Sequence, residues 1–176
     1  YKMGHFITDV HLASDNFANF ADCSSRLTVA LPEVYLYGEK INDNDMKNLF
    51  IYLLGKDYDI SGRLGRTLKN HLMAFFRIPD KLEPEKCRRK KIIFYPNTQI
   101  FVVRENEIIN KGFVLAVKGG TNAENHNHND VGQFIICINE KPLVIDLGSG
   151  EYKRNTFTDD RYSLFFTRGE SHNIPV

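Results

Sequence analysis

Two histidines, His126 and His128, stand two residues apart in a polar run that separates two apolar segments. The flanking segments, residues 113–117 and 133–138, are short, β-branched and aromatic, which is typical of buried strands. Functional side chains are often carried on loops that a rigid sheet holds in place. Since an imidazole can accept a proton near neutral pH or bind a metal, the run predicts a functional site where two strands end.

Asp146 and His172 add two further side chains of the kinds that bind metals. Asp146 follows the apolar residues 143–145, 18 residues after His128, and His172 lies near the end of the sequence. Imidazole nitrogens and carboxylate oxygens suit a borderline divalent metal such as Zn²⁺, so His128, Asp146 and His172 predict a metal site. If residues 126–128 are extended, both histidines face one ion; if they form a loop, one binds metal while the other faces a substrate.

Each of these groups also has a purely structural interpretation. The asparagines and aspartates around the histidines can cap turns, and Asp146 precedes a glycine turn, where aspartate is common. The glycines after Asp146 do not open a helix in a βαβ unit, which argues against a Rossmann nucleotide site. Asp130 is a candidate for orienting an imidazole. Tyr152 and Arg161 suit acid–base chemistry and charge neutralisation, or alternatively strand packing and a rim ion pair.

Composition restricts the class of protein and its partners. The 176 residues are 42% hydrophobic and 26% charged, as in ordinary globular proteins of one or two domains. The net charge of +1 creates no basic field, and the basic run 86–91 fits a solvated linker, so we expect no nucleic-acid partner. Three cysteines without a CxxC pattern argue against a disulfide framework. No apolar run reaches the roughly 20 residues of a membrane-spanning helix.

Helical patterns fill the first half of the chain. Residues 1–26 are polar and predict a long loop, and a short helix is expected to restart at Pro32 and end at Gly38. A clear apolar stripe at residues 46–54, capped by Asn42 or Asp43, predicts the next helix. Another helix is expected between a cap at Ser61 and Pro79, with His71 as a structural or surface residue.

After a charged linker at residues 80–91, the apolar period changes from helical to alternating. We expect strands at five places, residues 92–95, 100–103, 113–117, 133–138 and 143–145. Helices followed only by strands predict an α+β fold, divided into residues 1–85 and 86–176. So few helices cannot bury their apolar faces, so we expect a helical part that ends a larger helical domain and a β part that is incomplete at its C-terminus.

Residues 92–176, about half of the chain, resemble the heparinase II/III-like polysaccharide lyases. The segments that carry this resemblance are residues 118–134, 142–152, 157–162 and 171–173, and residues 19–22 are similar to a loop late in the family's helical domain. The resemblance implies the last helices of an α/α toroid followed by an antiparallel β-sandwich domain. It also implies cleavage of a uronic-acid polysaccharide by β-elimination.

The resemblance also assigns roles to the polar cluster. It implies that His128, Asp146 and His172 match the family's zinc ligands and that His126 matches a histidine at the active-site cleft. Zinc held by three protein side chains could be an open Lewis-acid site, but the resemblance implies a structural ion that pins the His126 loop. Fixing that loop matters, because an error of an ångström in position can cost about a hundredfold in rate. The expected catalytic residue is His126, whose neutral imidazole can accept a proton or hydrogen-bond the uronate carboxylate.

The expected partner is an acidic polysaccharide, either a glycosaminoglycan such as heparin or heparan sulfate, or an alginate-like polymer. Glu124, Tyr152 and Arg161 are further candidates for contact with it. The family's other catalytic groups, an Asn or His that neutralises the uronate and a Tyr acid–base, belong to helical segments, and residues 1–91 carry no matching motif. The remainder of a full-length protein is therefore an expected partner. Because polymer-degrading lyases are commonly exported, a secreted or periplasmic location in a bacterium is favoured.

Two other functions remain open at this point. A noncatalytic carbohydrate-binding β module would bind sugar without turnover, and a metal-dependent hydrolase would release saturated products and stop when its metal is chelated. β-Elimination differs from both because it leaves an unsaturated sugar that absorbs in the ultraviolet.

Overall fold

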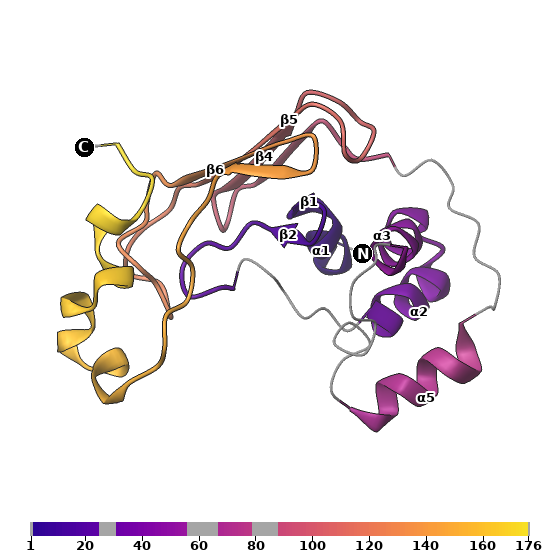
Figure 1. Ribbon diagram of the computed structural model, residues 1–176, viewed down its shortest axis with the longest axis horizontal. Coiled ribbons are helices and arrows are strands. Elements are labelled where there is room, and N and C mark those ends of the chain that lie inside the picture. Colours follow the sequence, from indigo (N-terminus) through magenta and orange to yellow (C-terminus); the bar gives the residue numbers. More distant parts are fainter. Residues whose placement is uncertain (1, 25–30, 56–66, 79–87, 176) are drawn as a thin grey trace.

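The computed structural model describes residues 2–24, 31–55, 67–78 and 88–175, which combine helices with an antiparallel sheet, so the predicted α+β class is confirmed at this level (Figure 1). The helices are α1 (Lys2–Asp9), α2 (Leu31–Ile41), α3 (Asn44–Leu54) and α5 (Leu68–Arg77). A small hairpin consists of β1 (His11–Ala13) and β2 (Asn16–Phe17). Four short 3₁₀ helices end the described chain, η1 (Arg154–Phe157), η2 (Asp159–Ser163), η3 (Phe165–Thr167) and η4 (Gly169–Ser171).

The main sheet is a five-stranded meander in which each strand pairs with its sequence neighbours. Its strands are β3 (Ile92–Tyr95), β4 (Ile100–Arg104), β5 (Phe113–Lys118), β6 (Phe134–Ile138) and β7 (Lys141–Val144). The first four agree with the predicted strands to within a residue. The last strand starts and ends earlier than the predicted 143–145, because a tight turn pairs Lys141 directly with Ile138.

The inner face of the sheet packs on the N-terminal segment, which was predicted to be a loop. That prediction is wrong for residues 2–17, since residues 2–9 form α1 and residues 11–17 form the β1–β2 hairpin, whereas residues 18–24 form no helix or strand. The helix forms because Phe6, Ile7 and Val10 recur at helical spacing and pack into the core of the helical part. Further along, Leu12 and Phe20 lie in the core beneath the sheet.

A buried arginine ties this N-terminal segment to the sheet. Nη2 of Arg104, on β4, donates to the backbone oxygens of Asp9 and His11 at 2.8 Å each, and the Tyr95 hydroxyl donates to Asp9 Oδ2 at 2.7 Å. Burial, together with the charge of Arg89, lowers the pKa of Arg104 to about 10. These bonds fix the segment under the strands. Residues 19–23 then lie near the loop that joins the end of β5 to the start of β6, where the Ala21 amide donates to Asp130.

Two helices pack closely through a glycine that was predicted to end the first of them. Helix α2 continues past Gly38 to Ile41, since Gly38 provides space: a Cβ there would stand 2.8 Å from Cβ of Met46 on α3. The predicted cap of α3 is confirmed, because Asp43 Oδ1 accepts from the Met46 amide at 3.1 Å. Helix α5 is capped by Thr67, and the predicted cap Ser61 lies outside the described residues.

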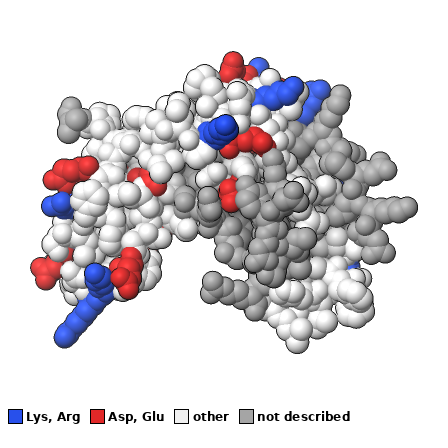
Figure 2. Space-filling view, viewed as in Figure 1, with Lys and Arg blue, Asp and Glu red and all other residues white. Residues whose placement is uncertain are grey.

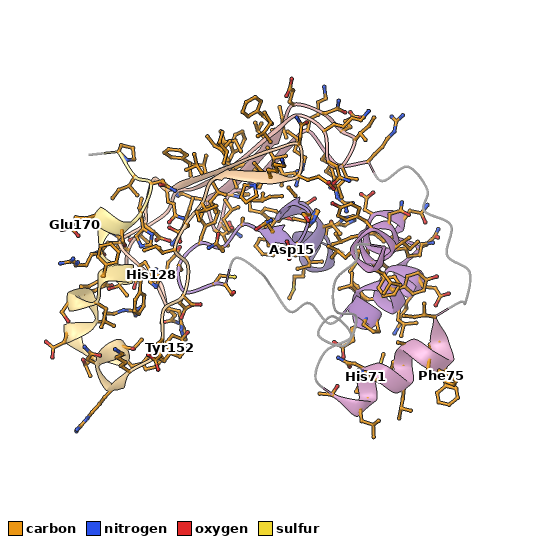
Figure 3. All side chains as sticks on the ribbon, viewed as in Figure 1. Asp15, His71, Phe75, His128, Tyr152 and Glu170 are labelled. Carbon is orange, nitrogen blue, oxygen red and sulfur yellow. The ribbon has the colours of Figure 1, made fainter. Side chains whose placement is uncertain are left out.

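Two apolar surfaces of the described structure face solvent. The outward positions of the sheet are apolar on every strand from β3 to β6, at Ile92, Phe94, Phe101, Val103, Phe113, Leu115, Val117, Phe134, Ile136 and Ile138. No described segment lies over this face in Figure 1. Helix α5 also exposes Leu68, Leu72, Phe75 and Phe76, and Phe75 projects away from the rest of the chain in Figure 3.

Several expectations about class can be compared with the described residues. No helix in them is long and apolar enough to cross a membrane. Basic side chains on the face drawn in Figure 2 lie mostly beside acidic ones, and Cys23 and Cys137 are free thiols. The predicted domain boundary at residue 85 falls in the range 79–87, outside the described residues.

Candidate functional site

The histidine-bearing loop joins β5 to β6 and is anchored at both ends. The Lys118 amide donates to the Gln133 oxygen at 2.9 Å, and the Gly132 amide donates to the Lys118 oxygen at 2.8 Å. Within the loop, His126 has a φ of 57°, in the left-handed region. This turn sends the two histidines to different environments: the His126 side chain is 58% exposed, while His128 is 0% exposed. Of the two arrangements the sequence allowed, the structure adopts the loop.

The three predicted metal ligands lie together, although they come from three segments. Nδ1 of His172, just after η4, lies 2.6 Å from Oδ2 of Asp146, which follows β7. The ring centres of His128 and His172 are 5.3 Å apart, and the ring planes differ by 31°. All three residues are buried, and Figure 3 places His128 between the strand ends and the 3₁₀ helices.

Three buried ring nitrogens in this cluster have no hydrogen-bond partner among the residues that the structure describes. They are Nδ1 and Nε2 of His128 and Nε2 of His172. Burial, and then the neighbouring His172, lower the pKa of His128, so its imidazole is neutral at pH 7. An unsatisfied buried polar group costs about 1–3 kcal/mol, and a neutral imidazole nitrogen is the form that binds a metal. The donor set therefore fits a zinc ion.

The spacing of the cluster is more open than a bound ion requires. A tetrahedral zinc with bonds of about 2.0–2.2 Å keeps its nitrogen and oxygen ligands about 3.3–3.6 Å from one another. In the set of His128, Asp146 and His172, the ligand atoms do not all lie within 4.8 Å of one another. The described residues contain a second group whose ligand atoms do lie that close together, namely His5, Asp43 and Asp45. The His128 ring would therefore have to turn toward Asp146 and His172 to share an ion with them.

The second group has contacts that explain it without a metal. Asp43 Oδ1 caps α3 through the Met46 amide, and Asp43 Oδ2 lies 2.6 Å from Nε2 of His5. The helix cap and the close approach of His5 on α1 engage both carboxylate oxygens, and the positive end of the α3 dipole disfavours a cation.

Asp130 has a different partner from the imidazole suggested by the sequence. Its Oδ1 accepts from Nζ of Lys118 at 2.7 Å, and its Oδ2 accepts from the Ala21 amide at 2.8 Å. Both side chains are buried, with 5% of Lys118 and 0% of Asp130 exposed. The interpretation of Asp130 as the group that orients a histidine is therefore wrong; it neutralises a buried lysine and holds the N-terminal segment against the loop.

The exposed His126 contacts a carboxylate from the beginning of the chain. Oδ2 of Asp22 lies 2.6 Å from Nδ1 of His126 and accepts from the Tyr152 hydroxyl at 2.6 Å. Burial works to raise the pKa of Asp22, but the hydrogen bonds from Tyr152 and His126 outweigh it and leave that pKa lowered. The same bond raises the pKa of Tyr152. The exposed ring of Phe157 meets both His126 and Tyr152 edge-on.

The other predicted substrate-contacting residues are engaged with the loop itself. Nη2 of Arg161 donates to the Asn127 oxygen at 2.6 Å, and the Tyr162 hydroxyl donates to Asn127 Oδ1 at 2.9 Å. Glu124 Oε2 lies 3.6 Å from Nζ of Lys118 and is 40% exposed. Arg161 therefore supports the backbone between the two histidines, while Glu124 still faces solvent beside them.

Asp22 is the site residue that sequence reasoning missed. It lies in a polar stretch whose aspartates and asparagines are individually unremarkable, and 104 residues separate it from His126. Its only sequence signal is its place in residues 19–22, the segment similar to a loop of the lyase family. A scan against protein-family models finds no match for this chain, and a search of curated proteins finds none either.

Proposed function

We propose that the chain is part of a polysaccharide lyase that cleaves a uronic-acid polymer, heparin- or heparan-sulfate-like or alginate-like, by β-elimination. The observation that carries this proposal is the convergence of His128, Asp146 and His172 in one buried cluster, with the exposed ring of His126 beside it. This arrangement supports the roles implied by the family resemblance, in which His128, Asp146 and His172 hold the loop through a metal and His126 faces the sugar.

The proposed metal is a structural zinc bound by His128, Asp146 and His172. Bound there, zinc would supply cross-links between the loop, the end of β7 and the C-terminal 3₁₀ segment. The unpaired nitrogens of His128 and His172 support this assignment. The direct contact between Asp146 and His172 already fixes two of the three segments relative to each other, so the ion would chiefly anchor the loop.

His126 is the proposed catalytic residue. The hydrogen on C5 of a uronate is weakly acidic, because its removal builds charge next to a carboxylate that is already negative. A site for this reaction must neutralise the carboxylate, take the proton and protonate the leaving oxygen. The accessible ring of His126 suits one of these tasks, and the exposed Phe157 and Tyr152 rings beside it offer apolar surface to a sugar.

We also propose that the sheet is one layer of a β-sandwich and that the helices end an α/α toroid. The apolar outer face of the sheet supports a second layer, because strands that are apolar on both faces are typical of sheets covered on both sides. The exposed apolar side chains of α5 similarly support further helices. An experimental structure of the complete protein with this sheet face open to water would contradict the sandwich.

The function is tested by incubating the complete protein with a panel of glycosaminoglycans, alginate and other uronates, and following ultraviolet absorbance. We expect absorbance to rise with at least one polymer, and His126→Ala to lower turnover by about 10²–10⁴-fold, the usual contribution of a positioned acid or base. His71→Ala, an exposed histidine on α5, is the matched control and should leave the rate unchanged.

Two other results of this experiment would indicate the two alternative functions. Saturated products and inhibition by a chelator would indicate a metal-dependent hydrolase. Sugar binding without any turnover would indicate a carbohydrate-binding module. Either result would overturn the lyase proposal.

A further inference from the structure

We propose that Asp22 is a positioning residue for His126, holding the ring in the tautomer whose proton is on Nδ1 and so presenting Nε2 as a proton acceptor. The use of that acceptor rests on the proposed lyase function, whereas the tautomer itself does not. His126 then has one role, since a neutral ring held this way accepts a proton and has no N–H left to donate to a substrate carboxylate.

The tautomer follows from what surrounds one oxygen atom. Asp22 Oδ2 lies 2.6 Å from Nδ1 of His126 and 2.6 Å from the Tyr152 hydroxyl. An ionised carboxylate only accepts hydrogen bonds, so both partners must donate to it. A neutral imidazole has a single N–H. If that hydrogen is on Nδ1, Nε2 carries the free lone pair.

Asp22 is able to position His126 because its own backbone is anchored. The preceding amide, that of Ala21, donates to buried Asp130 at 2.8 Å, and the following residue, Cys23, accepts from the Ser149 amide at 3.2 Å. Gly148 allows this close approach, since a Cβ there would stand 2.4 Å from the Cys23 oxygen. The Asp22 carboxylate is therefore held between the histidine-bearing loop and the segment that follows β7.

Tyr152 completes the arrangement from the other side. Its hydroxyl proton is directed to Asp22, and the Phe157 ring contacts both the Tyr152 and His126 rings, with centres 5.2 and 5.9 Å away. The phenol is thus committed to fixing the carboxylate. A proton taken up at Nε2 would convert His126 to an imidazolium, whose charge the adjacent Asp22 carboxylate offsets.

The tautomer can be measured without any enzymatic activity. In the chain labelled with ¹⁵N-histidine at a pH above 7, long-range ¹H–¹⁵N correlation distinguishes a protonated ring nitrogen from an unprotonated one. We expect His126 to show protonated Nδ1 and unprotonated Nε2. In Asp22→Ala the major form should change to protonated Nε2, while the signals of His71 on α5 stay unchanged. A wild-type His126 with protonated Nε2, or an unaltered pattern in Asp22→Ala, would overturn the proposal.

Two further variants keep the test decisive. Tyr152→Phe removes the second donor but leaves the carboxylate, so His126 should keep its Nδ1 proton; loss of that proton in this variant would contradict the assigned role of Asp22. If Asp22→Ala does not fold, Asp22→Asn has the same size, and its amide can donate to Nδ1, so the form with protonated Nε2 should again increase.

Turnover gives an independent measurement on the complete protein. Asp22→Ala should lower kcat by about 10²–10⁴-fold, with a much smaller change in KM, as expected when the orienting carboxylate of a histidine base is lost. An unchanged kcat in an active lyase would overturn the positioning role. A protein that cleaves no uronate polymer but shows the expected tautomer would refute the lyase function and leave the Asp22–His126 arrangement intact.

Discussion

The purified chain is expected to contain about one zinc ion, and His128→Ala is expected to lose it. His128 offers two buried, unpaired nitrogens beside Asp146 and His172, and removing it leaves two of the three protein ligands. At free zinc 100-fold above Kd, binding stabilises a fold by about 2.7 kcal/mol, a melting-temperature rise of roughly 5–10 °C at about 2–4 °C per kcal/mol. Elemental analysis and thermal melts with and without a chelator measure both effects.

Other histidines provide the controls and separate the two candidate positions of the ion. His126→Ala and His71→Ala should keep the metal, because one ring bonds Asp22 and the other lies on α5. His5→Ala tests the group at the start of α3. Zinc retained by His128→Ala and lost from His5→Ala would place the ion at the helix and contradict the assignment.

The second large effect is expected from Asp130, whose change to alanine should destabilise the fold by about 3–5 kcal/mol. The substitution leaves the Lys118 ammonium buried without its 2.7 Å partner, and an unpaired buried charge has a cost of that order. It also removes the acceptor of the Ala21 amide. Denaturant unfolding monitored by circular dichroism gives the free-energy difference.

Comparison with an exposed ion pair isolates the effect of burial. Glu33→Ala removes the partner of Lys69, in a pair whose side chains are 45% and 69% exposed, and should cost at most about 1 kcal/mol. Replacing both Lys118 and Asp130 by apolar residues of similar volume should recover much of the stability lost in Asp130→Ala. Equal small losses for Asp130→Ala and Glu33→Ala would show that the buried pair contributes no more than a surface pair.

Local pattern was sufficient for most of the sheet and for one helix. The alternating strands of β3 to β6 are rich in β-branched and aromatic residues, and Asp43 lies at the start of an apolar helical stripe, so short-range signals agree with the final structure. The prediction of an N-terminal loop was wrong because the few apolar residues that form the helix, Phe6, Ile7 and Val10, are outnumbered by polar ones. The predicted helix end at Gly38 was wrong because glycine is common both at helix ends and where helices pack closely. Only the position of Met46 beside Gly38 shows that close packing is its role here.

The chain by itself determined the kinds of groups at the site. The spacing of His126 and His128, between two strands, allowed a loop in which one histidine binds a metal and the other faces outward, and in the structure His128 is buried and His126 exposed. Asp146 and His172 could be predicted as metal ligands because carboxylate and imidazole are common metal-binding groups in proteins. These features depend on the identity and local order of residues, which the sequence states directly.

Only the tertiary structure decided which of these groups meet and what they do. Asp22 reaches His126 across 104 residues, Asp130 neutralises Lys118 and does not orient a ring, and Arg161 supports the Asn127 backbone. A side chain's partner depends on the path of the whole backbone and on which charges are removed from water. Such contacts between distant segments leave no periodic trace in the sequence, because the residues that make them are each ordinary in their own neighbourhood.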